Sequence, residues 1–309
     1  SGKNNVFMGA YAGYNDSQTD SYSRSNVMVG NDAGYNSIAG YNNVFVGHQT
    51  GYSNDFSFNN VFLGYNSGYN NKTGSDNIFI GHQAGFSNDS SNANIFIGND
   101  SGIKNENASG NVYVGHRTGN ENLSGNNNTI IGHESGHYNI NGSKNVFVGS
   151  YSGYYNKGKS NIFQGFKTGY NNDSGSYNIF VGSKAGYSNS SGSRNVYLGV
   201  GAGYSNTSGN KNLFQGWEAG NSNTIGKKNI YLGSRAGFSN SEGNKNVYLG
   251  YYAGYYTKGS NKLIIENSSA DSTQALIYGE FDNNLLTFNA DVGIGTTTPD
   301  KDLHVNGDA

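Results

Sequence analysis

Apolar and polar positions follow each other in short runs along this chain, and the runs recur at a fixed distance. The stretch 145–149 reads Asn-Val-Phe-Val-Gly, and its leading Asn returns at a constant spacing of 17, apart from one step of 21 and one of 16. With that Asn numbered as place 1, Gly occupies places 5 and 9 in every unit, and an aromatic residue usually occupies place 10. The fifteen units begin at Asn5, Asn26, Asn43, Asn60, Asn77, Asn94, Asn111, Asn128, Asn145, Asn161, Asn178, Asn195, Asn212, Asn229 and Asn246.

This spacing predicts a parallel β-solenoid. Glycine at fixed places supplies corners, and the β-branched and aromatic residues between them favour short strands. One unit is long enough for a coil with two short strands and two turns, and is too short to add a helix. The second strand is expected at places 8 to 10, as in Ala185 to Tyr187. We therefore expect an all-β repeat domain of about fifteen coils over residues 1–260, with successive coils about 4.8 Å apart. The recurrent Asn is expected to form a ladder, its amide bonding to the coils above and below.

The strand at places 2 to 4 is apolar on both of its faces. The side chains of Val146 and Val148 point to one face and that of Phe147 to the other. One face lines the coil interior, and the other needs a second cover, because an apolar stripe along the whole repeat exceeds what a soluble monomer exposes. We expect further copies of the same chain to provide that cover with cyclic symmetry, whose order this pattern leaves open.

Two units place Gln in this strand. Gln164 and Gln215 both occupy place 4, where most units carry Val, Ile or Leu. An amide left unpaired inside a thin coil costs about 1–3 kcal/mol, whereas copies that meet on a symmetry axis can bond in a ring. The presence of Gln at place 4 therefore favours an orientation of the strand in which the aliphatic side chains of places 2 and 4 contact partner chains and the Phe side chains of place 3 lie inside the coil.

The phrases "NVFVGHQTG" and "NVYLGVGAG" resemble the Asn-x-Val-x-Ile-Gly repeats of trimeric autotransporter adhesin heads. The resemblance covers about residues 4–260. It implies a left-handed parallel β-roll assembled as a homotrimer. It also implies the opposite orientation of the strand, with the aliphatic row inside the coil.

The C-terminal residues 261–309 leave this period. The segments 275–281 and 284–288 predict a β-hairpin about Asp282 and Asn283. The phrase "VGIGTTTPDKDLHVNG", residues 292–307, is similar to a linker of phage tail fibres and related bacterial surface fibres, where it often precedes a self-cleaving intramolecular chaperone. This resemblance implies that the C-terminal β-hairpin and linker region belongs to a trimeric fibre.

Composition excludes several classes of protein. The net charge is −2 and Lys and Arg form no run along the chain, so we expect no nucleic-acid partner. No apolar run reaches about 18 residues, so we expect no membrane span. The absence of Cys excludes disulfides and thiolate metal sites, and 14% aromatic residues argue against disorder. No cofactor motif is present.

Place 6 and place 10 carry the residues with the most chemistry. His48, His82, His116 and His133 occupy place 6, where stacked imidazoles on a trimer axis could bind metal. The same place also takes Asn, Ser, Phe, Val and Trp, so we favour a solvent-facing corner. The tyrosines at place 10 either offer sugar-stacking rings or close the coil as core with the hydroxyl at the rim, and we favour this architectural role. They are Tyr14, Tyr35, Tyr52, Tyr69, Tyr154, Tyr170, Tyr187, Tyr204 and Tyr255.

No catalytic constellation stands out. Glu134 and Asp173 are typical of the scattered acids, and no recurring pair or triad accompanies them. We expect no enzyme, and a homotrimeric extracellular fibre or adhesin, on a virion tail or a bacterial surface, that attaches to glycan or protein on a target cell. The alternatives are a passive shaft that presents a tip and a fibre enzyme acting on polysaccharide. Irregular turns are the expected specificity elements: the insertion within 14–25, the segment 55–58 and the corner at Trp217.

Overall fold

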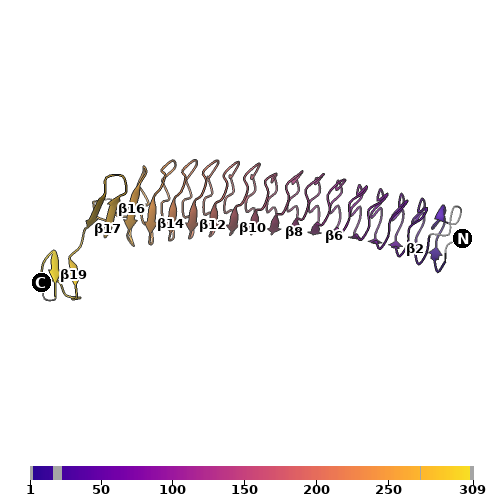
Figure 1. Ribbon diagram of the computed structural model, residues 1–309, viewed down its shortest axis with the longest axis horizontal. Coiled ribbons are helices and arrows are strands. Elements are labelled where there is room, and N and C mark those ends of the chain that lie inside the picture. The colour runs from indigo at the N-terminus through magenta and orange to yellow at the C-terminus, as the bar shows by residue number, and fades with distance from the viewer. Residues whose placement is uncertain (1–2, 17–22, 272, 307–309) are drawn as a thin grey trace. The chain divides into compact units, whose positions relative to one another are not determined.

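The computed structural model describes residues 3–16, 23–271 and 273–306 (Figure 1). The predicted insertion at 14–25 lies largely outside these residues. The chain divides into two compact units, Ser1–Asn178 and Ile179–Ala309. Both units are built from coils of one repeat each, so the prediction of an all-β parallel solenoid of about fifteen coils is confirmed.

The first unit contains ten coils, each with one three-residue strand. Each strand pairs in parallel with that of the next coil, so that Phe45 lies opposite Phe62 and Phe62 opposite Phe79. The strands are β1 (Val6–Met8), β2 (Val27–Val29), β3 (Val44–Val46), β4 (Val61–Leu63), β5 (Ile78–Ile80), β6 (Ile95–Ile97), β7 (Val112–Val114), β8 (Thr129–Ile131), β9 (Val146–Val148) and β10 (Ile162–Gln164).

The second unit contains five coils followed by a different sheet. Its coil strands, again parallel and in register, are β11 (Ile179–Val181), β12 (Val196–Leu198), β13 (Leu213–Gln215), β14 (Ile230–Leu232) and β15 (Val247–Leu249). The strands that follow are β16 (Lys262–Ile265), β17 (Ile277–Glu280), β18 (Leu285–Phe288), β19 (Val292–Ile294) and β20 (Leu303–Val305).

Among the described residues each coil has one strand, so the prediction of a second strand at places 8 to 10 is wrong. Two residues near it have left-handed backbone, such as Gln49 (φ 52°) and Gly51 (φ 59°), which turns the chain instead of extending it. The segment still bonds to its neighbour, because Gly51 N–H donates to the Ser67 carbonyl at 2.9 Å and Ser53 N–H to the Tyr69 carbonyl at 2.9 Å. Coils therefore remain hydrogen-bonded where no strand forms.

The coil interior is a stack of rings from place 3. Neighbouring rings lie nearly parallel with centroids 4.7 to 5.0 Å apart, as in Phe62 with Phe79 and Tyr197 with Phe214. These side chains are completely buried. The orientation favoured by Gln164, with Phe inside the coil, is confirmed, and the orientation implied by the β-roll resemblance is wrong for this chain.

The place 1 Asn ladder is confirmed, with backbone groups as its partners. The Oδ1 of Asn43 accepts from the backbone N–H of Asn60 at 3.0 Å, and the Nδ2 of Asn60 donates to the Gly74 carbonyl at 2.9 Å. Asn195 and Asn212 repeat this arrangement in the second unit. Each buried amide thus ties the start of one strand to the adjoining coil.

A second Asn ladder, at place 12, was not predicted. There the amides bond to each other: Asn71 Nδ2 donates to Asn54 Oδ1 at 3.0 Å, and Asn88 Nδ2 donates to Asn71 Oδ1 at 2.7 Å. The same Nδ2 groups also donate to the carbonyl three residues later, as Asn71 does to Gly74 at 2.7 Å. The signal in the sequence was the Asn that recurs at place 12.

The two glycines of each coil are corners for different reasons. At place 5, a Cβ on Gly64 (φ 132°) would lie 2.5 Å from the carbonyl oxygen of Gly81 in the next coil. At place 9, a Cβ on Gly203 (φ 59°) would lie 2.4 Å from the Tyr197 ring. Glycine thus supplies positive φ at both corners and room for the backbone or for the ring.

The C-terminal strands end the parallel stacking. β16 pairs in parallel with β15 and antiparallel with β17, and β17 pairs antiparallel with β18. The predicted hairpin is therefore confirmed, with a four-residue turn over 281–284 in which Asn284 has φ 50°. β19 and β20 form a separate two-stranded parallel sheet.

Candidate functional surfaces

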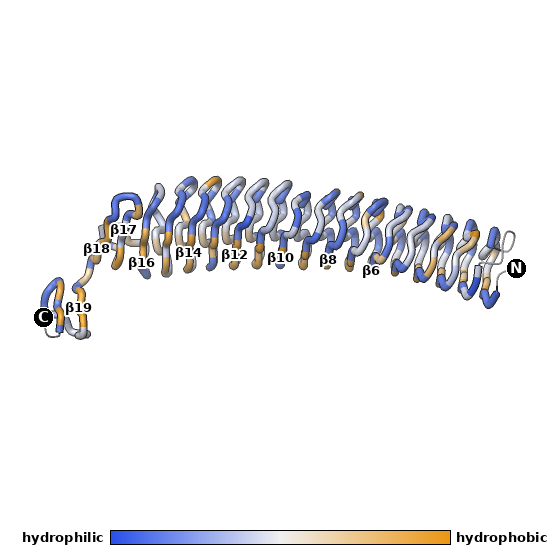
Figure 2. The backbone as a smooth tube through the Cα atoms, viewed as in Figure 1, coloured by the Kyte–Doolittle hydropathy of each residue, from blue (hydrophilic) through white to orange (hydrophobic). Residues whose placement is uncertain are grey.

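The aliphatic side chains of places 2 and 4 form the outer face of each unit. They are only partly buried, with exposed fractions near two fifths at Ile97, Val146 and Ile230. Figure 2 shows hydrophobic segments recurring at the strands and hydrophilic segments at the turns. Because the rings already fill the coil interior, this outer face remains an apolar surface in the single chain.

Gln164 and Gln215 lie on this outer face and are exposed. In β10, Gln164 lies opposite Val148 of the preceding coil. Its amide therefore meets water in the single chain and carries no desolvation cost. The ring of amides that we inferred from these residues requires copies of the chain and remains a prediction.

The aromatic residues at place 10 stack along each unit, outside the coil interior. Tyr35, Tyr52 and Tyr69 have centroid distances of 5.1 and 4.9 Å and lie within 6° of parallel. Their rings are half-buried, so the prediction that they are core is wrong, whereas their regular stacking agrees with the architectural role that we favoured. Loss of hydration, with the neighbouring phenols adding to it, raises the pKa of Tyr35 and Tyr52. The stack is architectural, and its ring edges reach solvent.

The histidines at place 6 are exposed at a corner, as predicted. His48 stacks on Tyr65 and Tyr65 on His82, both at 5.3 Å, and the rings of His116 and His133 are 5.2 Å apart. Among the described residues, no group of three or more His, Cys, Asp or Glu side chains gathers as metal ligands do. The acids singled out earlier are in ion pairs, Glu134 with Arg117 and Asp173 with Lys157.

The corner at Trp217 carries a hydrogen-bonded cluster. The guanidinium of Arg235 lies 4.2 Å from the Trp217 ring centroid, donates from Nε to Glu218 at 2.8 Å and from Nη1 to the Tyr252 hydroxyl at 2.7 Å. Those contacts raise the pKa of Arg235, the Glu218 bond most. Trp217 remains 47% exposed, so one large ring lies at the surface with Arg235 over its face. In the segment 55–58, Phe56 is the exposed residue, at 62%.

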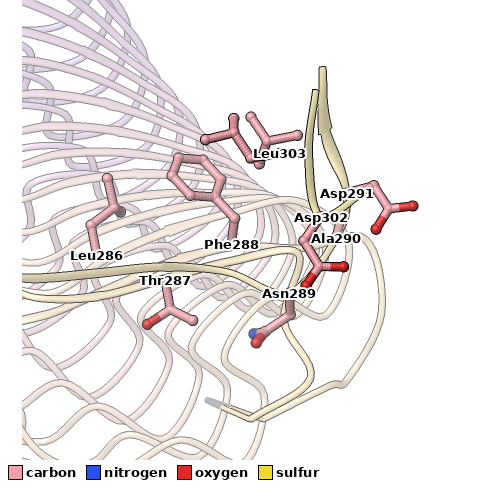
Figure 3. A pocket seen from close by; sticks show the side chains of 9 residues that line it. Leu286, Thr287, Phe288, Asn289, Ala290, Asp291, Asp302 and Leu303 are labelled. Carbon is pink, nitrogen blue, oxygen red and sulfur yellow. The ribbon is translucent and has the colours of Figure 1, made fainter. Parts of the chain in front are cut away.

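The C-terminal strands surround an open hollow of about 670 Å³ (Figure 3). Leu286, Phe288 and Leu303 line it, with Asp291 and Asp302 at its side. The three apolar side chains are each about half exposed. The hollow therefore offers an apolar contact surface in the region that resembles a fibre linker.

Comparison of the chain with protein-family models, with curated proteins and with solved structures gives no match. Within the described ranges, no helix has the length and apolar character needed to cross a bilayer. The surfaces above, and not a relative, are therefore the basis for a function.

Proposed function

We propose that this chain is the subunit of a homotrimeric extracellular fibre, on a virion tail or a bacterial surface, that attaches to a target cell. The observation that carries the proposal is the outer face. Rings fill the coil interior, yet places 2 and 4 are aliphatic in most coils, which a water-facing strand does not require. A partner copy with the same periodic face covers it throughout, and closed cyclic symmetry removes the remaining edge.

Three features support an assembly of this kind, and the first of them points to three chains. The repeat phrases and the phrase at 292–307 both resemble trimeric fibres. The exposed Gln164 and Gln215 suit a polar layer in which three amides bond in a ring. The exposed Leu286, Phe288 and Leu303 extend the apolar surface into the C-terminal strands.

The mass of the protein in native buffer tests the assembly. We expect three chains per particle, and a double variant Ile97→Asp/Ile131→Asp that is monomeric with an unchanged circular dichroism spectrum. Both side chains are about two fifths exposed, so the single coil tolerates the charge while an interface does not. The matched control His82→Asp/His116→Asp alters exposed corner residues and leaves the assembly intact. A stable wild-type monomer contradicts the proposal.

Attachment is tested separately with a glycan array and whole cells, using the assembled protein. Binding that falls when irregular turn residues such as Phe56 or Trp217 are changed to Ala supports an adhesive fibre. A trimer that binds no glycan and no cell is instead a passive shaft. Release of products from capsular polysaccharide would identify a fibre enzyme.

A further inference from the structure

Lys and Arg gather in one place in the second unit although they form no run in the sequence. Place 17, the residue before the Asn that opens the next coil, is Arg194, Lys211, Lys228 and Lys245 in successive coils. Lys227 adds a further cation at place 16. All five side chains are exposed, and we call them the basic row. Residues one repeat apart in sequence become neighbours because coils stack in register.

The backbone holds the basic row in line. The N–H of Lys211 donates to the Ser193 carbonyl at 3.1 Å, that of Lys228 to Asn210 at 3.0 Å, and that of Lys245 to Lys227 at 2.9 Å. The four members at place 17 share a left-handed φ of 57 to 60°, so their Cα–Cβ bonds leave the backbone in the same way. Parallel strands β12 to β15 set their spacing at about 4.8 Å per coil.

In the part of the chain that the structure describes, the three lysines of the basic row at place 17 have no opposite charge beside them. Residues 179–260 contain eight Lys and Arg and two Glu, a net charge of +6, whereas the first unit has nine Lys and Arg and eleven Asp and Glu, a net charge of −2. One of the two acids, Glu218, is paired with Arg235. Within the described residues, no carboxylate lies within 4 Å of the amine of Lys211, Lys228 or Lys245. The other acid, Glu242, likewise has no cation within 4 Å in the same described ranges.

Like charges repeated at strand spacing repel one another, so such a row has an electrostatic cost in the free chain. Elsewhere in this protein, a lysine is paired with an acid at the same place of the next coil, as in Lys72 with Asp89 and Lys104 with Glu121. The row also borders a hollow of about 270 Å³ lined by Ser193, Arg194, Asn210, Lys211, Lys227 and Lys228. A row of cations beside a groove is suited to an extended polyanion.

We propose that the basic row binds a linear anionic polysaccharide, whose carboxylate or sulfate groups pair with successive cations. This assignment rests on the proposed attachment to a cell surface and names the class of molecule that is bound. An extended polysaccharide carries its charged groups a few ångströms to about a nanometre apart, a spacing that one or two coils at about 4.8 Å each can match. Each pair is exposed and weak on its own, and the affinity comes from their number.

Nucleic acid fits the basic row less well. A duplex presents one charge per about 1.7 Å of axis on two strands and calls for a broad basic face, while this row is one cation wide. Single strands are bound by grooves with aromatic rings for base stacking. The residues at place 16 beside the row are Ser193, Asn210, Lys227 and Asn244, which include no ring.

The experiment measures binding of the full chain to polygalacturonate, dextran sulfate, neutral dextran, and single- and double-stranded DNA at several salt concentrations. We expect both anionic polysaccharides to bind and neutral dextran not to bind, and the tighter of the two identifies the acidic group. The variant Lys211→Gln/Lys228→Gln/Lys245→Gln should bind about tenfold more weakly, and its salt dependence should have a lower slope by about three.

The matched control Lys184→Gln/Lys258→Gln/Lys301→Gln removes the same charge from the same unit at exposed positions outside the row. It should retain wild-type affinity. Equal loss in both variants shows non-specific attraction and overturns the proposal, as does DNA binding as tight as polysaccharide binding at equal salt. A fibre that attaches to cells but binds neither polyanion refutes the polysaccharide assignment of the basic row and leaves the proposed function standing. A monomer that attaches to nothing refutes the proposed function.

Discussion

The two faces of each repeat strand differ in how much variation they accept. Place 3, in the coil interior, is an aromatic ring in thirteen of fifteen coils, with Met28 and Ile130 as the exceptions. Places 2 and 4, on the outer face, take Val, Ile, Leu, Thr, Met and Gln. An interior ring touches rings in both adjacent coils, so one poor fit disturbs three coils, while an outer side chain borders water in the single chain. The packing within the chain therefore accounts for place 3, and the apolar character of places 2 and 4 needs a cause outside the coil.

The largest effect should come from emptying the interior. Phe79 stacks between Phe62 and Phe96 at 4.7 and 4.9 Å, so Phe79→Ala leaves a cavity and should lower the free energy of unfolding by about 3–5 kcal/mol. Ile97→Ala on the outer face should cost about 1 kcal/mol in the monomer. Urea unfolding followed by circular dichroism measures both. Equal losses would remove the distinction between the two faces.

Overpacking the interior should be the next largest effect. Gly203→Ala would press a methyl group against Tyr197 at 2.4 Å and should destabilise by at least about 1–3 kcal/mol. Gly201, in the same coil, also has positive φ, but its nearest neighbour is Glu218 Cγ at 3.3 Å and other coils carry Gln or Lys at that place. Gly201→Ala should therefore stay within about 1 kcal/mol of wild type. If the two variants are equally stable, glycine is required at place 9 by the backbone conformation and not by contact with the ring.

A buried amide should matter less than a ring but more than any exposed Asn. Asn105 Nδ2 donates to Asn88 Oδ1 at 2.9 Å and to the Ala108 carbonyl at 2.7 Å, and both acceptors are buried. Asn105→Ala should cost about 1–3 kcal/mol. Asn107, two residues away and exposed, is the control, and Asn107→Ala should change stability by less than about 0.5 kcal/mol. Thermal unfolding of the two variants side by side is the measurement.

Exchange of Gln164 sharpens the comparison on the outer side. Gln164→Val should leave the monomer's free energy of unfolding within about 0.5 kcal/mol, because the side chain is exposed. In the proposed trimer the substitution removes a polar layer. The chains should then be able to align in more than one register, while the trimer keeps its stability. Cross-linking between single cysteines placed in different coils detects such slippage. A large loss of monomer stability would indicate that the Gln164 side chain lies in the coil interior, and would contradict the orientation described above.

Acid should affect the C-terminal sheet before the coils. Hydrogen bonds from Tyr278, Asn283 and Lys262 hold the pKa of Glu280 at about 2. A lowered carboxyl pKa stabilises the fold above the unfolded pKa, and that stability is lost as the pH falls from about 4.5 towards 2. Glu280→Gln should remove this acid dependence, and Glu242→Gln should not. Hydrogen exchange at the amides of 277–288 between pH 5 and 3 is the measurement.

The period was enough to predict the solenoid, the Asn ladder, the glycine corners and the C-terminal hairpin. The orientation of the strand followed from one polar exception, Gln164, against the resemblance to β-rolls. Four features, among them the second Asn ladder at place 12, were not predicted because they depend on geometry between coils. Left-handed residues at places 7 and 9 replaced the second strand, as at Gln49 and Gly51, and the tyrosines at place 10 proved to stack outside the core. The basic row was invisible because its members are far apart in sequence, and only register unites them.

The amide ladder at place 12 has a direction. In four successive steps, the Nδ2 of one coil donates to the Oδ1 of the coil before it, so these dipoles point the same way and polarise one another. At the start of the row, the Nδ2 of Asn54 has no partner among the described residues. A stretch of this repeat therefore has a dipole along the stack, as an α-helix has along its axis. Its two ends are chemically different, because in the described part of the chain the Nδ2 of Asn54 is left without a partner at one end while the Oδ1 of Asn122 accepts from the Gly125 N–H at 3.0 Å at the other. A coil gained by duplication of one repeat must therefore enter the stack in one orientation.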